Sequence, residues 1–213
     1  MLREKLNIDL SEEKTEFFTR YANFFLEKNS HTNLISKNDA KLLFEKHIFD
    51  SLAINLFLKT QKSENLLRLL DIGTGGGFPS VPIAILYENI NVFALDSIKK
   101  KINVIEEIKV HLELKNLFPI CERVENLHFK NNPKAYDFVT TRAVAPLELI
   151  LKYAVPNLKP GGYFIAYKSK KALDELKDAQ KTIKLLGVKM VDIIEYTLPL
   201  EEIHERNLII FQK

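Results

Sequence analysis

The chain has 213 residues, of which 46% are hydrophobic and 28% are charged, and its net charge is +3. This composition is typical of a soluble globular protein and excludes low-complexity and fibrous classes. A single cysteine excludes an intrachain disulfide framework and an all-cysteine metal site. No apolar stretch approaches the roughly 18 residues that span a bilayer. We therefore expect a cytoplasmic protein with no membrane segment. The excess of positive charge lies after residue 65, which allows an anionic partner without requiring one.

Residues 1–62 predict a helical extension. An aromatic stripe from Phe17 to Phe25, at helical spacing, indicates an amphipathic helix over 9–28. Asp9 or Ser11 would cap this helix, and the polar residues 29–31 would end it. A second helix is expected over 39–59, followed by a polar linker over 61–65.

Residues 63–213 predict one compact unit in which short apolar runs alternate with helices. The expected strands are 66–72, 91–96, 117–121, 136–141, 163–168, 188–196 and 207–211. The expected helices are 79–87, 99–114, 147–155 and 171–186, with Gly187 closing the last one. A turn is expected over 156–162, in which Gly161 and Gly162 supply positive φ.

The alternation of strands and helices predicts an α/β fold with a mostly parallel sheet. About ten residues separate the last two expected strands, which is fewer than a parallel crossover needs. We therefore expect that pair of strands to be antiparallel.

Glycine is concentrated at one point of the sequence. Four of the seven glycines lie within five positions of the segment LLDIGTGGGFPSVPIA, residues 69–84. The glycines follow the first expected strand of the sheet, at the edge where open α/β sheets bind their ligands. Glycines let the chain turn tightly and let a ligand approach the bare backbone. A ligand-binding loop is the favoured interpretation, and a glycine-rich turn without a ligand is the alternative.

The spacing of the motif narrows the choice of ligand. A P-loop is excluded because Gly77 is followed by Phe78 and Pro79 rather than by Lys and Ser or Thr. The dinucleotide pattern G-x-G-x-x-G is incomplete, since Phe78 occupies its last position and would obstruct a pyrophosphate. The segment from Asp71 reads D-x-G-x-G-x-G, and Asp96 at the end of the second strand could accept hydrogen bonds from a ribose. This pattern resembles the class I S-adenosylmethionine-dependent methyltransferases, which have a Rossmann-like seven-stranded sheet with a late antiparallel strand.

Two kinds of methyl transfer lack support in the sequence. The fourth strand is followed by TRAVAP, residues 141–146, rather than by the Asn/Asp-Pro-Pro-aromatic motif of enzymes that methylate exocyclic amines. Methylation at carbon 5 of cytosine needs a thiolate nucleophile. Cys121 ends an apolar strand, and we expect it to be a buried structural thiol.

Several motifs together resemble one family. They are HIFDS (47–51), LDIGTGGGFPSVP (70–82), LDS (95–97) followed by Lys100 and Lys101, RVE (123–125) and TRA (141–143). The combination is similar to the RsmG family, also called GidB, bacterial methyltransferases of guanine N7 in 16S rRNA. The resemblance covers about residues 33–168; Ser80 stands where a glycine is common, and Thr141 where a serine is common. It implies direct in-line attack by N7 on the donor methyl group, with S-adenosylhomocysteine as product and no general base.

The residues and the resemblance together define two sets of candidate site residues. The expected cofactor-binding residues are Gly73, Gly75, Phe78, Asp96, Ser97, Val124, Glu125 and Arg142, and Arg142 is also a candidate for a catalytic role. The expected RNA-binding residues are His47, Asp50, Lys100, Lys101, Lys168, Lys170 and Lys171. We expect no metal, because the five histidines show no metal-ligand spacing.

Each of these roles has a structural alternative. Phe78 could be a packing residue, Asp96 could cap the following helix, and Arg142 could form an ordinary ion pair. Glu125 could be a simple surface residue, and His47 and Asp50 could form a pair on a helix surface. The lysines could be a solvated face.

Other functions remain open at this level. They are a methyltransferase of a protein or small molecule, a dinucleotide-dependent oxidoreductase, and a non-catalytic RNA-binding module. The expected partner is the small ribosomal subunit or an assembly intermediate, and we expect the chain to be a monomer.

Overall fold

A computed structural model describes residues 1–61, 65–130, 136–170 and 172–213. A seven-stranded sheet with the order β3–β2–β1–β4–β5–β7–β6 forms its centre. The strands are β1 (Leu67–Ile72), β2 (Ile90–Asp96), β3 (Leu117–Cys121), β4 (Tyr136–Arg142), β5 (Leu158–Ser169), β6 (Lys189–Thr197) and β7 (Glu205–Gln212). Strands β1 to β5 pair in parallel, whereas β7 is antiparallel to both β5 and β6. This confirms the expected α/β fold and the expected antiparallel pair.

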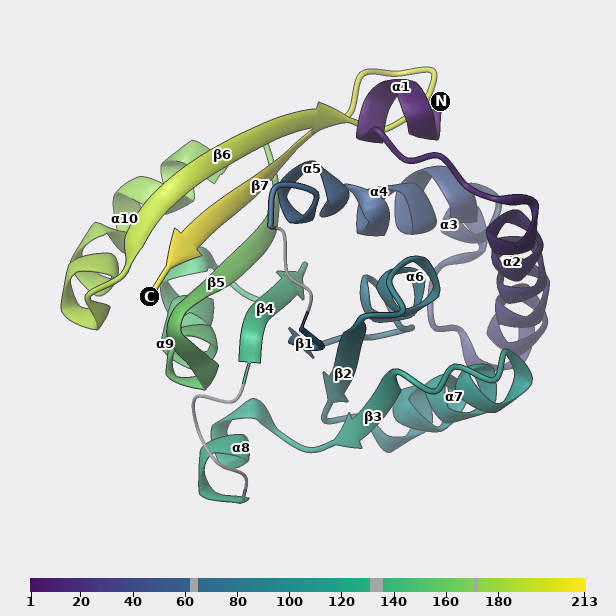
Figure 1. Cartoon of the computed structure of the whole chain (residues 1–213), viewed down its shortest axis with the longest axis horizontal. Helices are drawn as coiled ribbons and strands as arrows, with labels where there is room; N and C mark the ends of the chain where they lie inside the picture. Colours follow the sequence, from purple (N-terminus) through teal and green to yellow (C-terminus); the bar gives the residue numbers. More distant parts are fainter. Residues whose placement is uncertain (62–64, 131–135, 171) are drawn as a thin grey trace.

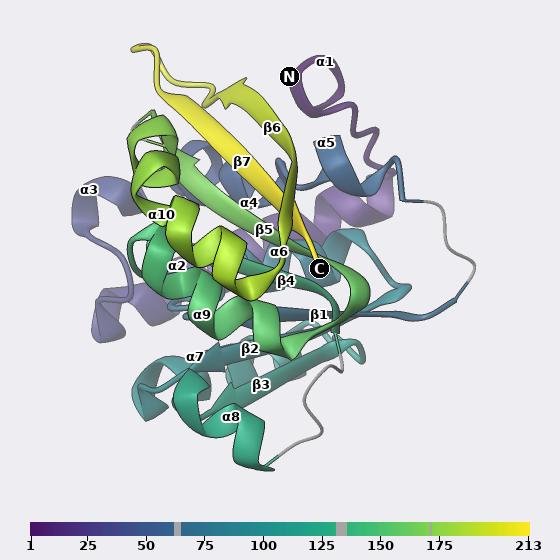
Figure 2. The same ribbon diagram turned by 90° about the vertical axis from the view of Figure 1, so that its left-hand side faces the viewer.

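Helices cover both faces of the sheet, as Figures 1 and 2 show. One face carries α8 (Val124–Lys130), α9 (Leu147–Asn157) and α10 (Ala172–Leu186), which pack over a core that includes Leu151 and Phe164. The other face carries α6 (Ser80–Leu86) and α7 (Lys99–His111), and α2 (Glu12–Thr32) packs against both of these helices. Because strands β1 to β4 are parallel, their carboxyl ends meet at one edge of the sheet.

Helix α2 starts later and ends later than the sequence predicts. Its N-cap is Ser11, whose side chain accepts a hydrogen bond from the backbone N–H of Lys14, as one of the two expected caps does. The expected break at 29–31 is wrong, because these residues lie inside α2, which ends at Thr32 and has Asn33 as its C-cap with a left-handed φ of 53°. Asn29 instead bonds the backbone of Ile35 through both of its side-chain polar atoms, at 2.9 and 3.2 Å. That contact folds the following chain back onto the helix.

The second helix is not continuous, which corrects the prediction over 39–59. It is divided into α3 (Lys37–Ala40), a π-helical turn (Phe44–Ile48), α4 (Phe49–Leu52) and α5 (Asn55–Leu58). All residues from 48 to 55 are buried, so this segment has no single apolar face. Tertiary packing on every side outweighs the helical periodicity, and the chain bends around its neighbours.

The N-terminal helices share one core with α6 and α7. Leu6, Phe25, Phe49 and Ile54 belong to the same buried cluster as Ile105 on α7. The expected division between an extension at 1–62 and a second unit at 63–213 stays a prediction.

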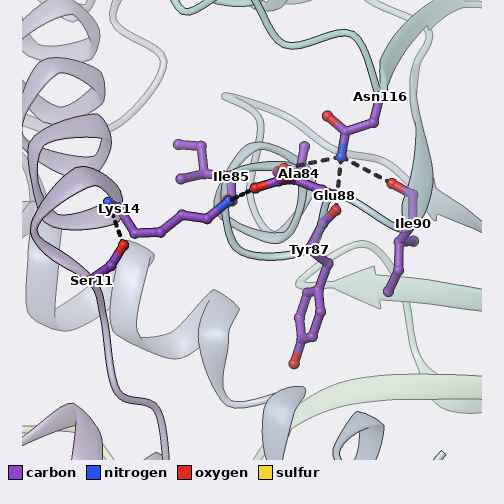
Figure 3. A network of polar contacts seen from close by, with 8 residues as sticks. All are labelled: Ser11, Lys14, Ala84, Ile85, Tyr87, Glu88, Ile90 and Asn116. Atoms are coloured by element: carbon purple, nitrogen blue, oxygen red, sulfur yellow. Dashed lines mark hydrogen bonds and ion pairs between the residues drawn. The ribbon is translucent and has the colours of Figure 1, made fainter. Parts of the chain in front are cut away.

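Helix α6, which follows the glycine loop, is held at its C-terminal end by two side chains from elsewhere in the fold (Figure 3). Lys14 on α2 donates to the carbonyl of Ile85 at 2.8 Å and to Glu88 at 2.6 Å. Asn116 donates from Nδ2 to three carbonyls, those of Ala84, Tyr87 and Ile90, at 2.8–3.1 Å. The bonds to Ala84, Ile85 and Tyr87 satisfy carbonyls that a helix end leaves without partners. They therefore fix the helix that carries the glycine loop at its other end.

Some local expectations are corrected by the structure. The short helices α1 (Leu2–Leu6) and α8 were not expected, and the turn over 156–162 is absent because α9 runs directly into β5. Gly161 has a φ of +78°, but Gly162 is not in the positive-φ region. A side chain at Gly162 would instead lie 3.0 Å from the carbonyl of Asp137. Gly187 ends α10 with a φ of +64°, as predicted. Across the ranges described above, no helix combines the length and apolarity needed to cross a membrane.

Candidate functional site

The glycine loop lies between β1 and α6, at the carboxyl edge of the sheet. Gly73, Gly75 and Gly77 have φ values of +73°, +58° and +93°, which favour glycine because a Cβ would be strained there. A Cβ at Gly73 would lie 2.5 Å from Cγ2 of Val144, and one at Gly77 would lie 2.7 Å from Cγ2 of Val81. Beside Gly75 the nearest atom in the described part of the chain is a backbone oxygen at 4.0 Å. The chain itself therefore fills the space at Gly73 and Gly77, and Gly75 is the glycine that faces open space.

A first cavity of about 380 Å³ opens beside this loop. It is built by the ends of β1, β2, β3 and β4, and its lining residues are Ile72, Gly73, Leu95, Asp96, Ser97, Ile98, Lys101, Glu122, Arg123, Val124, Glu125, Ala143 and Val144. Five of the eight expected cofactor residues are in this set: Gly73, Asp96, Ser97, Val124 and Glu125. Lys101, which was expected to bind RNA, also lines the first cavity. Gly75, Phe78 and Arg142 do not line it.

Asp96 is the carboxylate of the first cavity, and the backbone orients it. Its Oδ2 accepts a hydrogen bond from the N–H of Gly75 at 3.0 Å, and its Oδ1 accepts one from Ile98 at 2.9 Å. Lys101 Nζ lies 3.6 Å from Oδ2, and the Asp96 side chain is 8% exposed. The bond to Ile98 lies before α7, whose N-cap is Ile98 without a side-chain cap, so Asp96 does not cap this helix as the alternative expected. The bond to Gly75 joins the glycine loop to the end of β2.

The side chain of Asp71 anchors the segment that contains the glycine loop. The sequence analysis did not predict this role. This carboxylate is fully buried at the end of β1. It accepts hydrogen bonds from Ser80 at 2.5 Å and from Thr140 at 3.0 Å, and Ser80 also contacts the hydroxyl of Thr74. Burial raises the pKa of Asp71, although these hydroxyl bonds oppose the rise. The acid that opens the D-x-G-x-G-x-G motif is the signal that could have predicted this contact.

Phe78 belongs to an aromatic cluster rather than to a cavity wall. It is 3% exposed, and its ring lies 5.0 Å from that of Phe25 and 4.9 Å from that of His47. The guanidinium of Arg142 stands 5.4 Å from the ring centre. Helix α2 covers Phe78 from outside, which is why the ring is enclosed.

Arg142 ends β4 and binds the N-terminal helices. Its Nη1 donates to Asp50 Oδ2 at 2.8 Å and to the carbonyl of Lys46 at 3.1 Å. Its Nη2 lies 2.8 Å from Nδ1 of His47. Asp50 also accepts a hydrogen bond from Tyr196 on β6 at 2.6 Å. The ion pair expected as an alternative is therefore present, and it joins three parts of the chain that are far apart in sequence.

The same contacts set the protonation of His47. A guanidinium can only donate, so Nδ1 of His47 accepts and the ring hydrogen is on Nε2. Burial and the charge of Arg142 lower the pKa of His47 from 6.5 to about 4. The imidazole is therefore neutral at neutral pH. Its Nε2 is buried and has no hydrogen-bond partner among the described residues.

A second cavity of about 900 Å³ has Arg142 in its lining and shares only Ala143 and Val144 with the first cavity. His47, Asp50, Arg142 and Lys168 line it, together with Ala143 and Val144. The structure thus brings His47 and Asp50 to one cavity, where they face Arg142 rather than solvent alone.

The comparisons with known proteins agree on one family. Residues 14–207 match the family described as GidB, rRNA small subunit methyltransferase G. The chain belongs to the GidB family. Proteins named ribosomal RNA small subunit methyltransferase G from Staphylococcus saprophyticus and Desulfitobacterium hafniense are 36% and 37% identical to it. The matches cover 97% and 100% of this chain, and 84% and 87% of those proteins. A methyltransferase structure from Aquifex aeolicus, described as SAM-dependent, shares the fold with a TM-score of 0.59 at 18% identity, over 82% of this chain and 95% of that one.

Membership of the GidB family confirms the expected family and enzyme class, an rRNA methyltransferase. It also makes the alternatives of an oxidoreductase and a non-catalytic module unnecessary. The roles of the individual site residues stay predictions. The structure places some of them at the two cavities and others away from them.

The expected RNA-binding lysines of this GidB-family chain differ in their surroundings. Lys100 is exposed at the start of α7. Lys168 is 10% exposed and donates to Glu175 at 2.6 Å and to the carbonyl of Ala145 at 2.9 Å, so it holds the loop after β4. The side chain of Lys170 is 81% exposed and pairs with Glu205 at 2.8 Å, and Lys171 lies outside the described residues.

Cys121 is exposed, which corrects the expectation of a buried thiol. It ends β3, which is the edge strand of the sheet, so neighbouring strands cover it on one side only.

Proposed function

We propose that the chain transfers a methyl group from S-adenosylmethionine, bound in the first cavity, to N7 of a guanine in small-subunit rRNA that enters the second cavity. The observation that carries the proposal is the pair of cavities at the carboxyl edge of the sheet. One cavity holds a buried carboxylate beside the glycine loop, and the other opens next to it across a single loop. Family membership supports the substrate class.

The first cavity fits a nucleoside-sized donor. Its volume of about 380 Å³ is within the range of small-molecule sites. The two carboxylate oxygens of Asp96 have about four acceptor positions, and the bonds from Gly75 and Ile98 use two of them. The remaining acceptor positions could receive two ribose hydroxyls. Gly75, whose N–H donates to this carboxylate, has open space at its Cβ position. The donor would supply an electrophilic methyl group on a sulfonium sulfur.

The second cavity supports a reaction that needs no general base. Guanine N7 carries an in-plane lone pair and no proton, so nothing has to be removed before it attacks. Asp50 is committed to Arg142 and Tyr196, and His47 is neutral with its Nδ1 bound to Arg142. These groups hold one another in place, and their role would be to shape the cavity. Alignment of two reactants can contribute about 7–11 kcal/mol to lowering a barrier, without acid–base chemistry.

The test is direct transfer of a labelled methyl group to purified ribosomal subunits. We expect label in the small subunit and not in the large subunit, and we expect digestion followed by mass spectrometry to identify it as 7-methylguanosine. Label on another atom of the RNA, or on a protein, would overturn the proposed target. Failure of S-adenosylhomocysteine to bind the purified chain in calorimetry would overturn the proposed donor.

A further inference from the structure

The two cavities are separated by one short stretch of chain. Their sets of lining residues have only Ala143 and Val144 in common, in the loop that follows β4. The Val144 residue is 44% exposed although it is apolar. These two residues therefore lie between the two cavities.

Val144 also packs directly on the glycine loop. Its Cγ2 stands 2.5 Å from the point where a Cβ of Gly73 would lie, and its Cγ1 stands 3.3 Å from that point. Because valine is branched at Cβ, its side chain has few alternative rotamers and cannot easily move aside. Because Gly73 has no side chain, there is room for Val144 against its backbone. This contact fixes the position of Val144 relative to the glycine loop.

The backbone of the loop is strained and is anchored on both sides. Ala143 has a φ of +55°, a conformation that a residue with a Cβ rarely adopts. Before it, Arg142 is held by Asp50 and the Lys46 carbonyl. After it, Lys168 donates to the carbonyl of Ala145, and the N–H of Leu147 donates to Glu175 at 2.7 Å. Strained residues persist where the surroundings over-determine them, and they often occur at functional sites.

We propose that Val144 is a positioning residue for methyl transfer. It forms a partition between the two cavities, and the shape of its side chain sets where the methyl group of the donor faces the acceptor base. The inference rests on the proposed function. It assigns to Val144 neither binding energy for the donor nor any acid–base role. A small residue at this position would leave room above Gly73, and the two reactants would no longer be held in one alignment.

The experiment compares Val144→Ala and Val144→Thr with the wild-type chain, in single-turnover methyl transfer to unmethylated small subunits at saturating donor and RNA. Threonine has nearly the shape of valine and is also branched at Cβ. We expect Val144→Ala to lower the maximal rate by about tenfold or more, because small misplacements of reactants cost large factors in rate. We expect Val144→Thr to restore the rate to within about threefold. The control is Val110→Ala on α7, which removes the same atoms from a residue that is 75% exposed.

Binding gives a readout that does not depend on turnover. We expect the Kd of S-adenosylhomocysteine, measured by calorimetry, to change less than about threefold in Val144→Ala. A wild-type maximal rate in Val144→Ala would overturn the inference while leaving the proposed function standing. A loss confined to donor affinity, or a Val144→Thr variant as slow as Val144→Ala, would also overturn it. If the wild-type chain itself transfers no methyl group to the subunit, the proposed function fails and the inference fails with it.

Thermal unfolding tests the contact itself. Gly73→Ala should lower the unfolding temperature, because its Cβ would meet Val144 and its φ is +73°. Combining Gly73→Ala with Val144→Ala should recover part of that loss, since the clash is removed and only the backbone strain remains. A double variant with strictly additive losses would show that the partition does not rest on Gly73.

Discussion

The two cavities are built by different means. The first depends on contacts with nearby backbone: Asp96 is oriented by two N–H groups, and Gly73 to Gly77 supply the turn beside it. The second is shaped by side chains that cross the whole fold, since Arg142 meets Asp50 and Lys46 at separations of 92 and 96 residues. Tyr196 reaches Asp50 across 146 residues. We call the first cavity the donor side and the second cavity the acceptor side, after the proposed function. We infer that the donor side can be recognised from a short motif, whereas the acceptor side depends on complete folding of the N-terminal helices onto the sheet.

The largest effect on stability is expected when the ion pair of the acceptor side is removed. Arg142→Ala removes the partner of Asp50, and the two side chains are 15% and 6% exposed. Removing one member of a buried ion pair leaves an uncompensated charge and costs about 3–5 kcal/mol. We expect a loss of this size in the free energy of unfolding, measured by urea denaturation.

Arg3→Ala is the matched control for Arg142→Ala. Arg3 pairs with Asp9 at 3.3 Å, but both side chains are more than 70% exposed, at 79% and 73%. Exposed pairs contribute about 0–1 kcal/mol, so this variant should unfold nearly as the wild type does. Equal losses in Arg3→Ala and Arg142→Ala would contradict the view that the acceptor side is held by a buried ion network.

The difference between the cavities also explains what the sequence could predict. The positions of the strands, the antiparallel end, the glycine loop and Asp96 follow from local signals: apolar runs, a short last connection, the glycine spacing and an acid at a strand end. The π-helical turn at Phe44–Ile48 and the division of the second helix do not, because they arise from burial on all sides at 48–55. Phe78 was expected at the cavity wall because its neighbours in sequence are there. Helix α2, which covers Phe78, lies some fifty residues earlier in the chain. No local sequence pattern indicates this contact.

The second largest effect concerns pH. The folded pKa of His47 is about 4, below its usual 6.5, so between these values the unfolded chain binds more protons than the folded chain. The stability that a neutral His47 permits is therefore complete above pH 6.5 and is lost as pH falls toward 4. The pKa difference corresponds to roughly 3.4 kcal/mol. We expect urea unfolding of the wild type to show this loss.

His47→Asn isolates the contribution of this one group. The amide oxygen can still accept from Arg142, but it does not titrate. The free energy of unfolding of the wild type minus that of His47→Asn should fall as pH goes from 6.5 to 4, and other titrating groups cancel in the difference. A difference that stays constant over this range would show that burial and the charge of Arg142 do not hold His47 neutral.

The third effect concerns binding of the donor in the first cavity. Asp96→Ala removes the acceptor that we assign to the ribose, and hydrogen bonds to a charged group contribute about 1.5–3 kcal/mol. We expect the Kd of S-adenosylhomocysteine, measured by calorimetry, to rise about 10- to 100-fold. Asp174→Ala, at a residue whose side chain is 78% exposed on α10, is the control and should bind as the wild type does. Unchanged affinity in Asp96→Ala would remove the ribose assignment.

The smallest effect separates RNA binding from donor binding. Lys100 is exposed at the start of α7, whereas its neighbour Lys101 lines the first cavity 3.6 Å from Asp96. If Lys100 contacts a phosphate, Lys100→Ala should weaken binding of small-subunit RNA only a few-fold. It should also reduce the slope of log K against log salt by about 0.7–0.9, the value of one phosphate contact. The affinity for S-adenosylhomocysteine should be unchanged in Lys100→Ala and weakened in Lys101→Ala. An unchanged salt slope in Lys100→Ala would place this lysine on a solvated face, and the RNA surface would then have to lie nearer the second cavity.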